Sequence, residues 1–223
     1  MNTLRSHVAL IILGAGFAAI GYLRLYDTSL FTDSTRYVIW GTSFSHARGF
    51  VDDTQPDPER YVVNAPLYSV VLSPVLLVFP YSLFAAKAWT LAIGVGALMM
   101  FYLWLFRRLG KRAALVGTLI LAANPMMLVL ATEAMSEMAF VLLAILTVVF
   151  FETTDTSKPS FSGNHLSLLL TLSLLPLLRE VSVALVGAYL VVLLFQKQYK
   201  FALWLVIGVG VFLGALRSAG SSA

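Results

Sequence analysis

Three carboxylates have the residue type and placement best suited to chemistry: Asp33, Glu133 and Glu137. Each borders an apolar run, and a low-dielectric neighbourhood raises the pKa of a carboxyl group toward neutrality, which suits a general base. Glu133 and Glu137 are four residues apart and share one face if both lie on a helix. The three also offer the hard oxygen ligands that Mg²⁺ or Mn²⁺ prefers, so a divalent cation is a candidate cofactor. The alternatives are a helix cap for Asp33 and a solvated helix end for the two glutamates.

The composition places these acids in a membrane protein. Of the 223 residues, 59% are hydrophobic and 12% are charged, and the mean hydropathy is +0.87, whereas a soluble domain is about 25% charged. A soluble globule has too little interior for so much apolar surface, and a disordered or fibrous chain is excluded as well. The net charge of +4 comes from basic residues beside apolar runs, which indicates orientation in a bilayer and not nucleic-acid binding. The absence of cysteine excludes thiol chemistry.

The apolar runs predict an all-α integral membrane protein with about seven transmembrane helices. The seven runs are 8–25, 83–106, 113–131, 138–151, 166–178, 181–195 and 201–216. A cleaved signal peptide is the alternative for the first of them. An eighth run, 66–79, is short and carries two prolines, so we assign it to the membrane interface or to a re-entrant segment. That choice puts the basic cluster at 107–112 on the cytoplasmic side, as the distribution of positive charge requires.

The resulting topology has the N-terminus inside and the C-terminus outside. The cytoplasmic loops are 107–112, 152–165 and 196–200, and a large first outer loop covers 26–82. Nearly all carboxylates, including the three named above, then fall on the outer face. His46 is the outer histidine, and without His or Cys neighbours it is a poor metal ligand; His165 falls in a cytoplasmic loop.

The first outer loop contains an expected interfacial amphipathic helix. Thr32 or Asp33 is placed to cap its start, and Gly49 to end it. Tyr37, Trp40, Phe44 and Ala47 recur at helical spacing and form an apolar aromatic face. Aromatic residues favour the headgroup level, so this helix is predicted to lie along the membrane surface.

Four segments resemble, in order and spacing, elements of the GT-C superfamily of membrane glycosyltransferases. TDSTRYVIWGTSFSHARGFVDD, residues 32–53, is similar to the family's first outer loop, with an acid, a later Tyr and an Ala-Arg-Gly-aromatic ending. The other three segments are NAPLYSVVLSP (64–74), ANPMMLVLATEAMSEM (123–138) and LLRE (177–180). Asn64 and Ala65 depart from members that carry a basic residue before the Pro.

The resemblance implies a transferase that moves a sugar from a polyprenyl- or dolichyl-phosphate donor, as aminoarabinose transferases and protein mannosyltransferases do. The acceptor, a lipid, glycan or protein, would be met on the outer face of the plasma (inner) membrane. Asp33 would be the general base, and Arg36, Arg48, Lys87 or Arg179 would neutralise the phosphate. Lys87 is otherwise expected to anchor a span at the interface, and Arg179 to pair with Glu180. The substrate-binding residues implied are Arg36, Tyr37, Arg48, Tyr68, Glu133, Glu137 and Arg179.

The resemblance also implies that residues 1–223 form a single seven-span module. Family members usually continue with further spans or an outer domain, so we expect a fragment, a truncated product or a minimal module. Two other functions stay open. One is a membrane transporter or lipid flippase, which the nearly uncharged span interiors and the lack of two related halves disfavour. The other is a non-catalytic subunit of a larger glycosyltransferase assembly.

Overall fold

The described part of the chain is nearly all helical. The computed structural model describes the backbone of residues 2–27, 31–52, 54, 59–60, 66–154 and 163–221, so 64–65 and most of the predicted loop 152–165 lie outside the described residues. The helices are α1 (Asn2–Arg24), α2 (Thr32–Ser45), α3 (Leu67–Val78), α4 (Leu83–Ala122), α5 (Pro125–Thr132), α6 (Glu137–Thr153), α7 (Gly163–Leu178), α8 (Ser182–Phe195) and α9 (Tyr199–Ser221). Two short strands, β1 (Val51–Asp52) and β2 (Glu59–Arg60), pair antiparallel.

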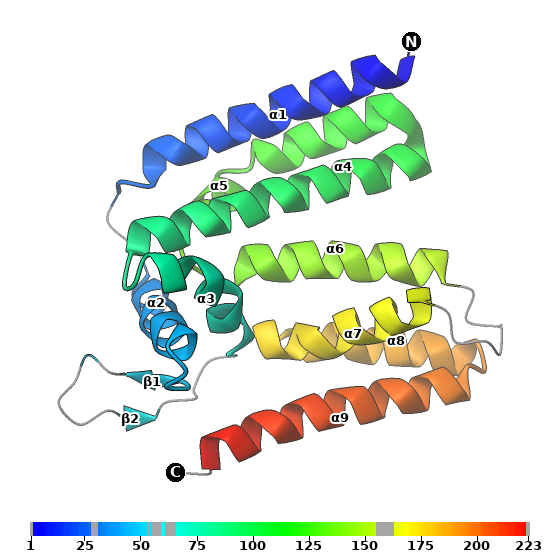
Figure 1. The fold of residues 1–223 in the computed structure, drawn as a ribbon. Coiled ribbons are helices and arrows are strands. Elements are labelled where there is room, and N and C mark those ends of the chain that lie inside the picture. Colours follow the sequence, from blue (N-terminus) through cyan, green and yellow to red (C-terminus); the bar gives the residue numbers. More distant parts are fainter. Residues whose placement is uncertain are drawn as a thin grey trace.

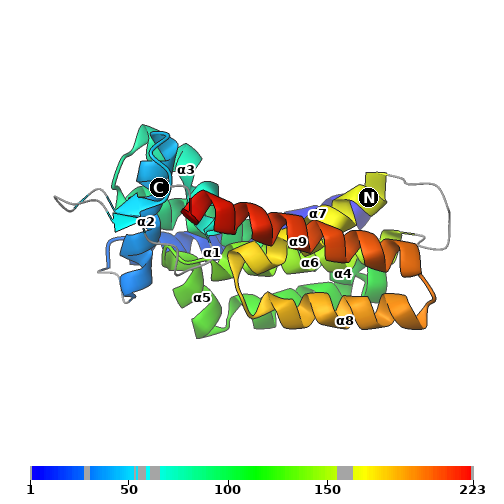
Figure 2. The same cartoon turned by 90° about the horizontal axis from the view of Figure 1, so that it is seen from below.

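The long helices lie roughly side by side as a stack, and α2 and α3 lie across one end of it (Figure 1). Helix α5 lies at this same end in both views, while the N-terminus lies at the opposite end (Figures 1 and 2). We call the first end, formed by α2, α3 and α5, the α2 end. The opposite end carries the reversal of α4 and the connection between α8 and α9, and we call it the Gly110 end.

Helix α4 is two antiparallel arms joined at Gly110. This residue has φ 80° and ψ 176°, a left-handed conformation that favours glycine. The arms touch, since Ala114 of the second arm packs with Tyr102 and Leu105 of the first. A Cβ at Gly117 would lie 2.8 Å from Leu105 Cδ1. The reversal falls within the loop predicted over 107–112.

The run 113–131, expected as one continuous span, is broken after Ala123. Asn124 accepts a hydrogen bond from the Met126 N–H at 2.9 Å, and Pro125 occupies the first turn of α5. Proline favours a helix start and prevents continuation of the preceding helix, so the continuous helix predicted here is wrong. Helices α5 and α6 are then bent by 112° relative to each other.

One described helix, α4, is long and apolar enough to cross a membrane. Helices α5 and α6 reach that size only as a pair across their 112° bend, and the other apolar helices have 10–17 described residues. A span needs about 20 apolar residues. The seven predicted spans are therefore not shown by helix length and composition.

The aromatic face of α2 is buried in the protein, where the sequence analysis placed it at the membrane surface. Tyr37 and Trp40 belong to one core cluster with Leu72 and Leu76 of α3. The two helices approach closely at Gly41, where a Cβ would lie 2.6 Å from Leu76 Cδ1. Of the expected face, Tyr37 and Trp40 are therefore buried, whereas Phe44 is half-buried and Ala47 is exposed beyond the end of α2. The spacing did not reveal that α3 covers the buried part.

Helix α3 contains an internal proline, and a serine hydroxyl supplies the hydrogen bond that the proline cannot donate. Pro74 has no N–H to give to the carbonyl of Val70, and the hydroxyl of Ser73 donates to that carbonyl instead, at 2.7 Å. Tyr68, Leu72 and Leu76 of this helix are fully buried. Helix α3 is therefore a packed part of the α2 end.

Helices α7, α8 and α9 share a second core. Its centre is formed by Leu168, Leu172, Leu193 and Leu205. His165, predicted in a cytoplasmic loop, lies in α7, and its buried ring is 5.8 Å from that of Phe201. The loop prediction failed here because α7 extends three residues beyond the apolar run that begins at 166.

Candidate functional site

The α2 end gathers most of the predicted site residues from five helices. Asp33 lies in the first turn of α2, Glu133 directly follows α5, and Glu137 begins α6. Lys87 lies in the second turn of α4, and Arg179 directly follows α7. Together with Arg36 of α2, these side chains form three acid–base pairs.

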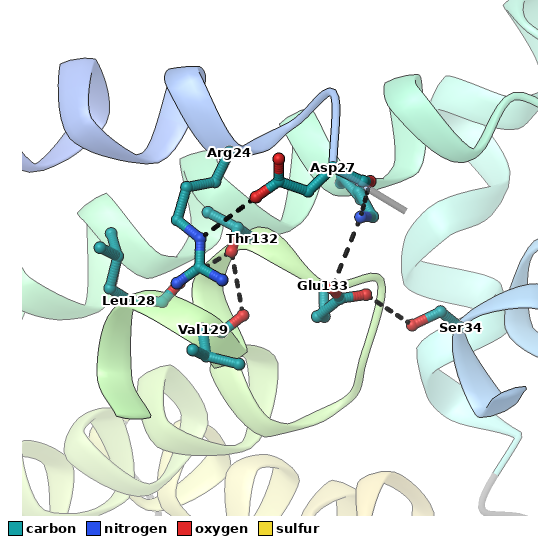
Figure 3. Close-up of polar contacts among 8 residues, drawn as sticks. Arg24, Asp27, Ser34, Leu128, Val129, Thr132 and Glu133 are labelled. Carbon is teal, nitrogen blue, oxygen red and sulfur yellow. Dashed lines mark hydrogen bonds and ion pairs between the residues drawn. The ribbon is translucent and has the colours of Figure 1, made fainter. Parts of the chain in front are cut away.

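The first pair, Lys87 with Glu133, is sealed from solvent. The Lys87 side chain is 1% exposed and that of Glu133 is 5% exposed, with 3.5 Å between Lys87 Nζ and Glu133 Oε1. Lys87 also donates to the Asp27 carbonyl at 3.0 Å, and the Ser34 hydroxyl donates to Glu133 Oε2 at 3.3 Å. Figure 3 shows Glu133 between Ser34 of α2 and the Asp27 segment after α1. Removing one partner of such a buried pair leaves the other charge buried without a counter-charge, which lowers the free energy of unfolding by about 3–5 kcal/mol.

A surface pair and a threonine flank this buried pair. Arg24 Nε lies 3.6 Å from Asp27 Oδ2, and both side chains are partly exposed. The Thr132 hydroxyl donates to the carbonyls of Leu128 and Val129, at 3.0 and 3.1 Å, at the end of α5 (Figure 3). Both contacts are local, and they stabilise the chain after α1 and the last turn of α5 next to the buried pair.

The second pair, Arg179 with Glu137, joins the ends of α7 and α6. Arg179 Nη1 contacts Glu137 Oε1, and the side chains are 36% and 17% exposed. Within the described residues, the other carboxylate oxygen, Glu137 Oε2, is buried without a hydrogen-bond partner. Arg179 therefore pairs across helices, where the sequence analysis weighed a pairing with its neighbour Glu180.

The third pair, Asp33 with Arg36, is half exposed. Arg36 Nη1 lies 3.6 Å from Asp33 Oδ1. The predicted helix cap is wrong, because α2 is preceded by Phe31 at the cap position and no side chain caps its first N–H groups. The Asp33 carboxylate instead stands in the first turn, where the helix dipole favours a negative charge.

Tyr37 lies among the second and third pairs. Burial raises the pKa of Tyr37 and a hydrogen bond with the Ser136 side chain lowers it, while the charges of Asp33 and Glu137 raise it and that of Arg179 lowers it. The Tyr37 ring meets the ring of Tyr68 edge-on, with centroids 5.0 Å apart. Tyr68 itself is fully buried, and its hydroxyl shares a hydrogen bond with Thr90 Oγ1. Tyr68 therefore packs against Tyr37 from the protein interior. Tyr37 is the tyrosine that lies next to the charged pairs.

The three carboxylates do not form a divalent-metal site. Among the described residues, no group of three or more His, Asp or Glu side chains is placed to hold a metal ion. Glu133 and Glu137 do not share a helix face, because α5 ends before Glu133 and α6 starts at Glu137 in a different direction. Each carboxylate faces a separate cation. The donor set as arranged does not fit Mg²⁺ or Mn²⁺.

Arg48 is not brought to this site. It follows the far end of α2, about 18 Å along the helix axis from Asp33 at 1.5 Å per residue. His46 caps that far end, with 2.8 Å between its Nδ1 and the Thr42 carbonyl. Arg48 and His46 thus lie apart from the three pairs.

Lys87 is the contributor that sequence reasoning placed wrongly. It was expected to anchor a span at the interface, yet it is buried and paired. Its position inside an apolar run is the signal, since a buried lysine needs a charged partner. The partner stands 46 residues away, so spacing alone does not identify it.

Comparison with family models, with curated protein sequences and with solved structures yields no match.

Proposed function

We propose that this chain is a membrane glycosyltransferase of the GT-C type, which uses a polyprenyl-phosphate-linked sugar and an outer-face lipid, glycan or protein acceptor. The observation that carries the proposal is the convergence of three acid–base pairs at one end of an apolar helical stack. Five of their six members come from the motif segments 32–53, 123–138 and 177–180, which are far apart in sequence, and the sixth, Lys87, lies in α4 outside these segments. The resemblance of these segments to the GT-C family supports the same reading.

In the proposed placement the chain crosses the membrane seven times. The crossings are α1, the first arm of α4, its second arm together with α5, then α6, α7, α8 and α9. Large apolar side chains exposed along α1, α8 and α9 support contact with lipid, including Ile11, Ile12, Phe195 and Trp204. The exposed basic residues of the Gly110 end favour a cytoplasmic location for that end, which puts the α2 end outside.

The proposed reaction is a direct displacement at the sugar. The Asp33 carboxylate accepts the proton of the acceptor hydroxyl, and the acceptor oxygen attacks the anomeric carbon as the bond to the phosphate oxygen breaks. The polyprenyl phosphate leaves with the bonding electrons, and the configuration of the sugar carbon is inverted. Asp33 suits this role because its side chain is 42% exposed and only loosely paired, at 3.6 Å from Arg36.

Two arginines are placed to receive the phosphate. Arg36 is 49% exposed and Arg179 is 36% exposed, and each stands beside a carboxylate that holds it in place. Arginine binds phosphate oxygens with two parallel hydrogen bonds, so either side chain can neutralise the leaving group. The Lys87–Glu133 pair is almost completely buried, and it contacts α2 through the hydrogen bond from Ser34 to Glu133.

The test is sugar transfer in native membranes by the Asp33→Asn variant, measured by mass spectrometry of the lipid-linked donor and the modified acceptor. Loss of a general base reduces the rate by about 10²–10⁴-fold. Glu180→Gln, an exposed carboxylate at the same end, is the matched control and should keep its activity. Full activity of Asp33→Asn would reject the role of Asp33. Solute movement into vesicles without transfer chemistry would favour a transporter, and activity only with a second, longer subunit would favour a non-catalytic partner.

A further inference from the structure

The Gly110 end exposes a group of basic side chains that the proposed reaction does not use. Arg107, Arg108, Lys111 and Arg112 are all exposed on the two sides of the α4 reversal. Lys197, in the turn between α8 and α9, and Lys200, in the first turn of α9, are exposed at the same end of the stack (Figure 1). We call these six residues the basic end.

The acid described at this end is already neutralised. Glu152, at the end of α6, pairs with Arg108 through both its oxygens: Arg108 Nε donates to Oε2 at 3.0 Å, and Arg108 Nη2 lies 2.6 Å from Oε1. The indole N–H of Trp104 also donates to Oε2, at 3.1 Å. Within the described part of the chain, Arg107, Lys111 and Arg112 make no ion pair. Among the described residues, Glu152 is thus taken up by Arg108, and the three neighbouring cations around Gly110 have no acidic partner.

Apolar side chains are interleaved with these cations. Phe106 is 37% exposed and Leu109 is 65% exposed, directly beside Arg107 and Arg108. Exposed apolar side chains next to basic ones fit the boundary between acyl chains and headgroups, where the apolar parts enter the lipid and the charges reach the phosphates. A nucleic-acid surface would gain nothing from the exposed Leu109.

We propose that the turn around Gly110 binds the headgroups of anionic phospholipids through Arg107, Lys111 and Arg112. Each basic side chain near an anionic leaflet contributes about 1 kcal/mol, which is about fivefold in affinity. The two arginines add bidentate contacts to phosphate oxygens. This proposal rests on the membrane placement given above but not on sugar transfer.

The experiment measures which phospholipids stay with the protein. The full chain is purified in detergent with an added equimolar mixture of phosphatidylglycerol and phosphatidylcholine, and the phospholipids that co-purify are quantified by mass spectrometry. The wild-type protein should retain phosphatidylglycerol over phosphatidylcholine, and R107Q/K111Q/R112Q should lose at least about fivefold of that preference. The charge-retaining variant R107K/K111R/R112K is the matched control and should keep it. High salt should weaken the preference of the wild-type protein, which provides a readout without any substitution.

Two outcomes overturn the proposal. One is an equal preference in the wild-type protein and in R107Q/K111Q/R112Q, or none in either. The other is displacement of phosphatidylglycerol by an RNA oligonucleotide, which would assign the surface to nucleic acid. In both cases the protein still carries phospholipid, so the membrane placement stands. Purification of the wild-type protein without detergent and without any phospholipid would instead contradict the membrane placement itself.

Discussion

At the α2 end, Lys87 and Glu133 are almost completely buried, and Lys87 Nζ lies 3.5 Å from Glu133 Oε1. At the Gly110 end, by contrast, the side chains of Arg107, Lys111 and Arg112 are exposed and make no ion pair with the described residues. A buried charge needs a partner of fixed geometry, because its desolvation is costly. An exposed charge contributes a field that salt screens. The α2 end can therefore hold its side chains in a fixed geometry, while the Gly110 end can attract a negatively charged surface.

The largest effect that tests this comparison is expected from Lys87→Met. It leaves the Glu133 carboxylate buried without its cation, which should lower the free energy of unfolding by about 3–5 kcal/mol. Thermal unfolding in detergent measures the change. The charge-free double variant K87M/E133L should recover much of the loss, because no buried charge remains unpaired. At the other end, Lys111→Met should change stability by less than about 0.5 kcal/mol, and an equal loss at both ends would remove the distinction between them.

The next effect concerns Arg179, the site arginine that pairs with Glu137. Arg179→Gln removes one charge-assisted phosphate contact and the partner of Glu137, so the KM for the lipid-linked donor should rise at least about tenfold. Steady-state transfer rates at varied donor concentration separate this change from a loss of kcat. A KM unchanged within error would place the phosphate elsewhere. Lys200→Gln, a basic residue of the opposite end, serves as the control.

A smaller effect is expected in alkaline solution at Tyr37. Its pKa is raised in the folded state, chiefly by burial, so the folded protein holds the phenol proton more firmly than the unfolded chain does. The corresponding stability is fully present below pH 10.0, the ordinary pKa, and is lost as the pH rises toward the folded-state value. Thermal unfolding across this range should show a smaller alkaline loss in Tyr37→Phe than in the wild-type protein. Identical alkaline curves would mean that Tyr37 is not buried as described.

The smallest effect is expected from Arg48→Gln. Its position beyond the far end of α2, about 18 Å from Asp33, keeps it out of reach of the reacting atoms. Transfer activity should stay within about twofold of the wild-type value, a change of under ~0.5 kcal/mol. A loss as large as that of Arg179→Gln would show that the site extends along the whole of α2.

The sequence is informative about the helices and less so about how they pack. The apolar runs correspond to helices, except that 113–131 is divided between α4 and α5, and Gly110 with its basic neighbours marks the reversal of α4. Helical spacing also placed Tyr37 and Trp40 together on a buried face of α2, but spacing does not say whether protein or lipid covers a face, and the cover proved to be α3. The break at Pro125 was readable from its residue type, yet the apolar run around it suggested continuity.

For the site as well, the residues could be predicted from the sequence but their contacts could not. Asp33, Tyr37, Glu137 and Arg179 were identified by residue type and position and lie close together. Their pairing was not predictable, because Lys87 and Glu133 are 46 residues apart and Arg179 reaches Glu137 from another helix. Such contacts depend on how the helices pack against one another at the α2 end. The local sequence pattern of one helix does not predict which residues of another helix it will contact.

In the proposed placement, the two ends of the stack face opposite sides of a membrane. The chain has no cysteine, so single cysteines report position without background. Glu180→Cys probes the α2 end and Lys111→Cys the Gly110 end, since both side chains are exposed. A membrane-impermeant maleimide applied to intact cells should label Glu180→Cys at once and Lys111→Cys only after permeabilisation. Labelling of both before permeabilisation, or of neither, would contradict the account.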